Sequence, residues 1–184
     1  MAREPSAQTA RRMLASGDLK GCVDYARRTF AESALRQGIS IPGNPEFVMR
    51  KLFLHRFAAE TAPGWGEAQE RCGELFLQLA DNETAAFYLG RAFTLNPADG
   101  FTGMRLGGAL LSLDRFEEAS RVLTRVAQAN PLEPGPWFYL GQAEMGRERP
   151  DAAVRAFKRY LLLSPDSPQA PAVKKVIASL SRKK

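Results

Sequence analysis

Apolar positions in the stretch from residue 66 to residue 167 recur every three or four residues, with polar residues between them. This spacing predicts amphipathic helices that each bury one face. Turn residues and prolines divide the stretch, since a residue that precedes proline is pushed out of the α region. We therefore expect an all-α structure with these antiparallel helix pairs: 67–79 with 83–95, 101–113 with 116–128, and 136–147 with 151–163.

The same stretch repeats itself at a period of thirty-four residues. Three columns carry one residue type in every unit: Gly73, Gly107 and Gly141; Ala85, Ala119 and Ala153; Pro97, Pro131 and Pro165. A fixed period of this size is typical of helical repeat arrays. Glycine in a helix interior costs roughly 1 kcal/mol relative to alanine, so its recurrence predicts that a neighbouring helix packs against it.

Two glycines of the last unit should differ in their tolerance of a side chain. A leucine at Gly141 should overpack the helix pair, and we expect Gly141→Leu to cost about 1–3 kcal/mol of stability. Gly146 lies near the end of the same expected helix. We therefore expect Gly146→Leu to cost much less.

The last unit resembles the tetratricopeptide repeat. Trp137-x-x-Leu140-Gly141 is followed by Ala153-x-x-x-Phe157 and by Pro165, at the thirty-four-residue period of that family. The resemblance covers residues 66–167 and implies an all-α, right-handed α–α superhelix (a solenoid) with a C-terminal capping helix. Three residues depart from the family pattern: Glu144 stands where Tyr is preferred, and Gln69 and Gly103 stand where Trp is preferred.

The resemblance suggests how the whole chain is divided. We expect a degenerate helix pair at 3–36, a Gly/Pro-rich connection with an extra helix at 37–65, repeats at 66–99, 100–133 and 134–167, and a capping helix with a basic tail at 168–184. The capping helix has an apolar stripe formed by Val173, Val176, Ile177 and Leu180. The open end of a repeat array needs such a helix, with one apolar and one polar face.

Charge is unevenly distributed along the chain. The formal net charge of +6 is the sum of +4 in residues 1–65, −4 in 66–133 and +6 in 134–184. The basic C-terminal residues lack the interleaved aromatic residues of a stacking platform, so we interpret them as solvated helix faces, which argues against a nucleic-acid partner. No apolar run is long enough to span a membrane, and the amino terminus does not resemble a secretory signal. We expect a cytoplasmic protein.

Residues that could carry chemistry are few. Cys22 and Cys72 stand at small-residue core positions of separate helices, which is typical of buried free thiols in a reducing compartment. The single histidine, His55, lies in an aromatic-rich helix, and we interpret it as an interfacial or core residue, although the sequence leaves a pairing with a cysteine open. Nucleotide-binding loops and Cys/His zinc spacings do not occur. We expect no enzyme activity, no catalytic residues, no cofactor and no metal.

The resemblance implies a binding groove, because the first helix of each tetratricopeptide pair lines the concave side where peptides dock. The corresponding positions here are Glu67, Glu70, Glu74, Leu77, Phe101, Met104, Leu111, Phe138, Gln142 and Met145. Relatives that clamp a carboxylate need Lys, Asn and Arg there, whereas this chain has mainly acidic and apolar residues. We expect a protein or peptide partner with apolar anchors and with basic flanks that pair with the glutamates. The alternative is that the helix expected at 44–61 fills the groove.

Two functions are compatible with this pattern. The first is a non-enzymatic scaffold or adaptor that holds a partner segment in the concave groove. The second is a dedicated chaperone, because a few helices ahead of three repeats and a terminal helix are similar to the type III secretion translocator chaperones. Those chaperones are usually acidic and have a shorter N-terminal part, which favours the first function. The sequence leaves open the partner, the source organism, the oligomeric state and whether the chain is a fragment of a larger protein.

Overall fold

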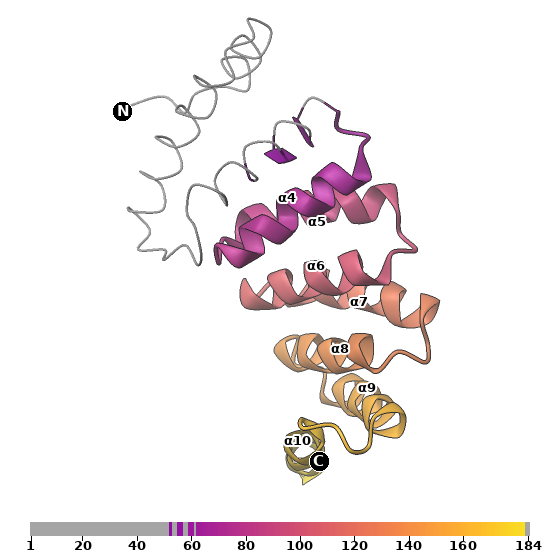
Figure 1. Cartoon of the computed structure of the whole chain (residues 1–184). Coiled ribbons are helices and arrows are strands. Elements are labelled where there is room, and N and C mark those ends of the chain that lie inside the picture. The colour runs from indigo at the N-terminus through magenta and orange to yellow at the C-terminus, as the bar shows by residue number, and fades with distance from the viewer. Residues whose placement is uncertain (1–51, 53–54, 57–58, 61, 183–184) are drawn as a thin grey trace, which may run out of the picture. The chain divides into compact units, whose positions relative to one another are not determined.

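The computed structural model describes residues 52, 55–56, 59–60 and 62–182. The expectations for residues 3–36, for most of 37–65 with its helix at 44–61, and for Cys22 lie outside the described residues. All regular secondary structure in the described part is helical (Figure 1). The helices are α4 (Gly66–Gln78), α5 (Asn82–Leu95), α6 (Gly100–Ser112), α7 (Phe116–Ala129), α8 (Pro134–Gly146), α9 (Pro150–Leu163) and α10 (Ala170–Arg182).

These helices confirm the expected all-α fold. Each helix of the three expected pairs has a counterpart whose ends lie within about two residues of the expected ones. The chain forms two compact units, Met1–Ala92 and Phe93–Lys184. Within the second unit, α6 packs on α7, α7 on α8, α8 on α9 and α9 on α10 (Figure 1). Successive helices therefore pack as neighbours, as the repeat pattern predicts.

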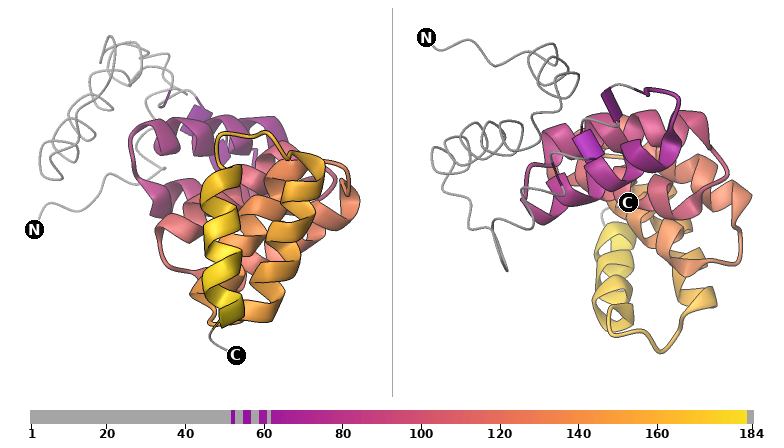
Figure 2. Two further views of the ribbon diagram at one scale, coloured as in Figure 1. Left: turned by 90° about the horizontal axis from the view of Figure 1, so that it is seen from below. Right: turned by 45° about the horizontal axis from the view of Figure 1, so that its top comes forward.

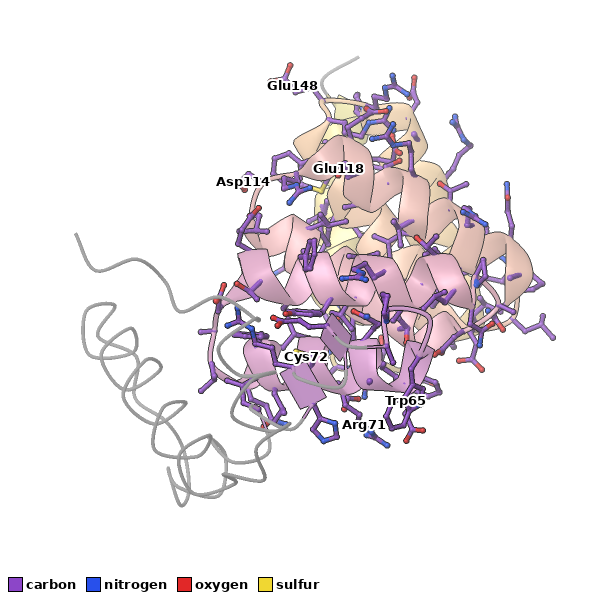
Figure 3. All side chains as sticks on the ribbon, turned by 90° about the horizontal axis from the view of Figure 1, so that it is seen from above. Trp65, Arg71, Cys72, Asp114, Glu118 and Glu148 are labelled. Atoms are coloured by element: carbon purple, nitrogen blue, oxygen red, sulfur yellow. The ribbon has the colours of Figure 1, made fainter. Side chains whose placement is uncertain are left out.

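The turn inside each helix pair places one residue in the left-handed region. Three residues with φ between 55° and 58° occupy this position: Ala80, Asp114 and Glu148. In each turn, the next backbone N–H donates to the carbonyl oxygen five residues earlier at 2.9–3.0 Å: Asp81 to Phe76, Arg115 to Leu110, and Arg149 to Glu144. This hydrogen-bond pattern ends the first helix and reverses the chain. Figure 3 shows Asp114 and Glu148 pointing outward at these turns.

The glycine column marks the closest approach between the two helices of a pair. A Cβ placed on Gly107 would lie 2.5 Å from Leu123 Cδ2, and one on Gly141 would lie 2.5 Å from Phe157 Cδ1. Both neighbouring side chains are buried, so neither can move aside into solvent. Gly73 makes the same kind of approach in the first unit. The packing explanation of the glycine column is therefore confirmed.

The structure contradicts the expectation that a leucine costs much less at Gly146 than at Gly141, because the space beside Gly146 is filled. Gly146 is exposed near the end of α8, yet a Cβ there would lie 2.5 Å from Cε1 of Phe116, the first residue of α7. This contact joins two successive repeats, and the period within one repeat gives no sign of it. Gly108 is a better control position, because a Cβ built there would have nothing within 4 Å.

The last helix, α10, lies beside α9 and covers its apolar side (Figure 2). The buried cluster consists of Ala153, Phe157, Tyr160 and Val173, with Val176, Ile177 and Leu180 packed against it. Lys174 and Lys175 are exposed on α10. The apolar stripe read from the sequence is thus the packing face of this helix.

The first turn of α6 is fixed by a side-chain cap. Asp99 Oδ1 accepts hydrogen bonds from the backbone N–H of Phe101 at 3.0 Å and of Thr102 at 3.2 Å, and Oδ2 accepts one from the Thr102 hydroxyl at 2.7 Å. Burial alone would raise the pKa of the Asp99 carboxyl, but these hydrogen bonds outweigh burial and lower that pKa. The ionised carboxylate therefore stabilises the start of α6.

Adjacent glycines on α6 provide a test of close packing. Gly107→Ala should lower the free energy of unfolding by about 1–3 kcal/mol, because the new methyl group overpacks Leu123. Gly108→Ala should raise it by up to about 1 kcal/mol, since alanine favours the helix and the space is open. Urea unfolding followed by circular dichroism measures both changes. Equal shifts of the two midpoints would remove the close-packing explanation.

The cap at Asp99 should make part of the stability depend on pH. Asp99→Ala should cost about 1 kcal/mol near neutral pH. Because the pKa of Asp99 is lower in the folded state, its contribution is present above the unfolded pKa of about 3.9 and is lost as the pH falls through the folded value. Urea unfolding of wild type and variant across acidic pH should show this difference shrinking. Asp99→Asn keeps an uncharged capping acceptor and should remove most of the pH dependence; a pH-independent cost of Asp99→Ala would contradict the assignment.

Candidate protein-binding surface

In the second unit, α6 and α8 are each the first helix of a helix pair. They contact each other and carry equivalent stripes of residues. The stripe on α6 contains Phe101, Met104, Gly108 and Leu111, and the stripe on α8 contains Gly135, Phe138, Gln142 and Met145. A Cβ placed on Gly135 would lie 3.0 Å from Met104 Sδ, so the two stripes lie next to each other. We call the surface formed by Phe101, Met104, Gly108, Leu111, Gln142 and Met145 the α6/α8 face.

The six residues of the α6/α8 face are uncharged, and the face is partly open to solvent. Phe101 is 70% exposed and Met145 is 40% exposed, while Met104 and Leu111 are half-buried. Burying a charged group against such residues without a pairing partner is costly, so the face favours apolar side chains. Methionine side chains are flexible and adapt to different apolar shapes. The structure thus brings together the predicted site residues of α6 and α8 on a surface that suits an apolar ligand.

Phe138 differs from the other predicted site residues because it also belongs to the core. Its ring centre lies 5.1 Å from that of Tyr160 and 6.2 Å from that of Phe157. The Tyr160 hydroxyl lies 2.6 Å from Ser167 Oγ, just ahead of α10. Truncating Phe138 would therefore disturb the packing of α9 and α10 as well as any binding, and Phe101 and Met145 are better residues for separating the two effects.

The acidic site residues lie on α4, in the first unit. Glu67, Glu70, Glu74 and Leu77 follow one another at helical spacing. Glu74 forms an ion pair with Arg71, with Nη1 3.0 Å from Oε2, so its charge is partly compensated. These residues form an acidic stripe within their own unit.

Two departures from the repeat pattern are compensated by local contacts. Gln69 is fully buried, and its Nε2 donates to the Ala59 carbonyl at 2.8 Å, which ties α4 to the preceding helical segment. Gly103 lies against the rings and methyl groups of Phe93 and Val126, which fill the space of the missing indole. Neither position serves the candidate surface.

Glu144, the third departure, is part of a buried polar network that the sequence did not reveal. Its Oε1 accepts hydrogen bonds from the Ser120 hydroxyl and, at 2.7 Å, from Arg147 Nη1, which also donates to Ser120 Oγ at 2.8 Å. Arg147 Nε lies 2.7 Å from Glu117 Oε2, close enough for an ion pair but without hydrogen-bond alignment. The network joins α7 to α8. The available signal in the sequence was Arg147, which follows Glu144 by three residues and caps the end of α8.

Cys72 is a buried free thiol, as expected (Figure 3). Burial raises the pKa of Cys72 to about 12, so the thiol stays protonated at neutral pH and is a poor nucleophile. Close by, Glu60 Oε1 accepts hydrogen bonds from Arg56 Nε at 2.7 Å and from the Tyr88 hydroxyl at 3.3 Å. His55 is half-buried in the same helical segment as Arg56.

The part of the chain that the structure describes offers neither a cluster of metal-binding side chains nor a membrane-spanning helix. No group of three or more His, Cys, Asp or Glu residues is placed there to hold a metal ion. None of the helices there is both long and apolar enough to cross a membrane.

Comparison with known proteins adds to this geometry. Residues 106–178 match the tetratricopeptide repeat family. This segment of the chain therefore carries tetratricopeptide repeats. Among curated proteins no match is found. The match includes α7, α8 and α9 and most of α6 and α10, and it therefore contains most of the α6/α8 face.

Solved structures of tetratricopeptide proteins share the fold. A crystal structure of MamA matches with a TM-score of 0.65 and 16% identity, over 72% of this chain and 75% of that one. PcrH in complex with the chaperone binding region of PopD matches with a TM-score of 0.57 and 20% identity, over 64% of this chain and 92% of that one. The first TPR of Spaghetti (RPAP3) bound to the HSP90 peptide SRMEEVD matches with a TM-score of 0.58 and 15% identity, over 63% of this chain and 93% of that one. At these identities the likeness establishes the helical-repeat fold.

The network around Glu144 should be sensitive to loss of its arginine. Arg147→Met should destabilise the protein by about 3–5 kcal/mol, because Glu144 is left buried without a countercharge. Arg115→Gln breaks an ion pair of the same spacing with Glu118, but that pair is exposed and should contribute at most about 1 kcal/mol. Thermal melts compare the two variants.

A double variant separates charge from packing in this network. Adding Glu144→Gln to Arg147→Met removes the uncompensated charge and should recover much of the lost stability. The assignment fails if Arg147→Met melts like Arg115→Gln, or if the second substitution recovers nothing.

Proposed function

We propose that this chain is a non-enzymatic protein-interaction module, a scaffold or adaptor, whose α6/α8 face binds an apolar segment of a partner protein. The tetratricopeptide fold is that of a protein-interaction scaffold. The observation that carries the finer proposal is the uncharged face itself, where Phe101 remains 70% exposed. A large aromatic side chain gains most from burial when a partner covers it.

The chemistry of the face limits the partner. A bound segment must bring apolar anchors for Phe101, Met104, Leu111 and Met145, since none of these positions offers a counterion. The excess of acidic residues in 66–133 would favour a partner with basic flanking residues. The buried free thiol of Cys72 suits a reducing compartment and supports a cytoplasmic location.

A dedicated chaperone is the second candidate function. PcrH, which is similar in structure, was solved with the chaperone binding region of PopD. If this chain is such a chaperone, one client protein should be soluble only when the two are co-expressed. An adaptor would instead bind partners that are already folded and soluble alone.

The test begins with a pull-down on the full chain and identification of bound proteins by mass spectrometry. Phe101→Ser combined with Met145→Ser should weaken binding of a recovered partner by on the order of 2 kcal/mol, largely through faster dissociation. Both side chains are exposed, so the melting temperature should hardly change. Surface plasmon resonance measures the binding.

Two controls decide whether the α6/α8 face is responsible. Leu95→Ser alters another exposed apolar side chain, at the end of α5, and should leave binding unchanged. Glu70→Lys with Glu74→Lys should slow association and change its salt dependence without abolishing binding. Wild-type affinity in the Phe101/Met145 variant would reject the proposed face.

A further inference from the structure

Two leucines of the second unit are largely exposed away from the α6/α8 face. Leu132 in the α7–α8 turn is 75% exposed, and Leu162 near the end of α9 is 70% exposed. Single exposed leucines are common on protein surfaces and need no explanation. These two differ from isolated leucines, because Arg159 of α9, one helical turn before Leu162, donates a hydrogen bond to the α7–α8 turn that carries Leu132.

Arg159 links the two segments that carry the leucines, α9 and the α7–α8 turn. Its Nη2 donates to the Pro131 carbonyl at 3.3 Å, and Trp137 Nε1 donates to the same oxygen at 3.3 Å. The Arg159 guanidinium lies 6.0 Å from the Trp137 ring centre. Leu132 directly follows Pro131, and Leu162 lies one helical turn beyond Arg159. We call the set Leu132, Trp137, Arg155, Lys158, Arg159 and Leu162 the turn patch.

Equivalent positions of the other repeats show which parts of the turn patch the fold needs. Arg159 corresponds to Arg91 and Arg125, and all three guanidinium groups lie 5.5–6.0 Å from an aromatic ring centre. The counterparts of Leu162 are Thr94 and Gln128, and those of Lys158 are Gly90 and Thr124. The arginine is therefore common to all three repeats and lies near an aromatic ring in each, whereas the repeat folds without an exposed leucine or a lysine at the other two positions.

The turn patch also carries positive charge. Arg155 and Lys158 are exposed and form no ion pair with any residue that the structure describes. Glu133, exposed beside Leu132, places a carboxylate at the edge of the patch. A flat membrane of anionic lipids that contacted Leu132 would also contact the Glu133 carboxylate, and the like charges would repel each other. A segment that places its acids only opposite the cations avoids that repulsion.

We propose that the turn patch binds a short acidic segment of a partner protein, in which two apolar side chains flank Asp or Glu residues. The apolar side chains would cover Leu132 and Leu162, and the carboxylates would meet Arg155, Lys158 and the free edge of the Arg159 guanidinium. A patch of so few residues is far smaller than the surface that binds a folded domain, which favours a short linear segment. This site is independent of the α6/α8 face and takes a ligand of opposite character.

A labelled peptide tests the proposal directly. The probe is a short fluorescein-labelled peptide with two leucines among glutamates, titrated with the full chain and followed by fluorescence anisotropy. Leu132→Ala combined with Leu162→Gln, residues taken from the equivalent positions Ala98 and Gln128, should weaken binding about tenfold or more. Arg155→Gln combined with Lys158→Gln should weaken it and flatten its salt dependence.

Matched controls distinguish binding at this site from nonspecific binding of the peptide. Leu95→Ala, at another exposed leucine, and Phe101→Ser on the α6/α8 face should both leave peptide binding unchanged. A peptide with lysines in place of the glutamates should not bind. The proposal is overturned if the acidic peptide does not bind, if the two-leucine variant binds it like wild type, or if phosphatidylserine vesicles bind the turn patch while the peptide does not.

Discussion

The fold depends on the contact between a bare helix backbone and one large side chain of the partner helix. Leu123 lies over Gly107 and Phe157 lies over Gly141, at distances that leave no room for a Cβ. A side chain seated on a glycine fixes both the separation of the two helices and their relative rotation. The α6/α8 face follows from this contact, because Gly108 and Gln142 each lie one residue beyond these glycines and so turn toward another side of their helices.

The repeat tolerates unusual residues where a neighbour restores what is missing. A buried carboxylate would normally be costly, and Glu144 is acceptable because Arg147 and Ser120 surround it. A missing indole at Gly103 is replaced by Phe93 and Val126. In both cases a departure from the family pattern is local, and the helix pair around it keeps its bounds.

The sequence predicted the helices well because they depend on short-range signals. Helical spacing, prolines after the second helices and the recurring glycines all act within one repeat, and the observed bounds agree with them. The sequence did not predict the contacts between repeats. The ring of Phe116 against Gly146 and the hydrogen bond from Ser120 to Glu144 join elements whose relative positions no periodic pattern encodes. The stripe positions of the candidate surface followed from the family resemblance, whereas the extent to which each side chain is exposed required the folded chain.

The closing hydrogen bond of each turn bears on how such repeats can diverge. The carbonyl that accepts it belongs to Phe76, Leu110 or Glu144, one column that holds an aromatic ring, an aliphatic chain and a carboxylate in successive repeats. Every amino acid supplies a backbone carbonyl, so exchanging this side chain leaves the turn closed. The column is therefore evolvable: mutation there can introduce a new inter-repeat interaction, as the hydrogen bond from Ser120 to Glu144 illustrates, while the chain reversal on which the array depends is inherited unchanged.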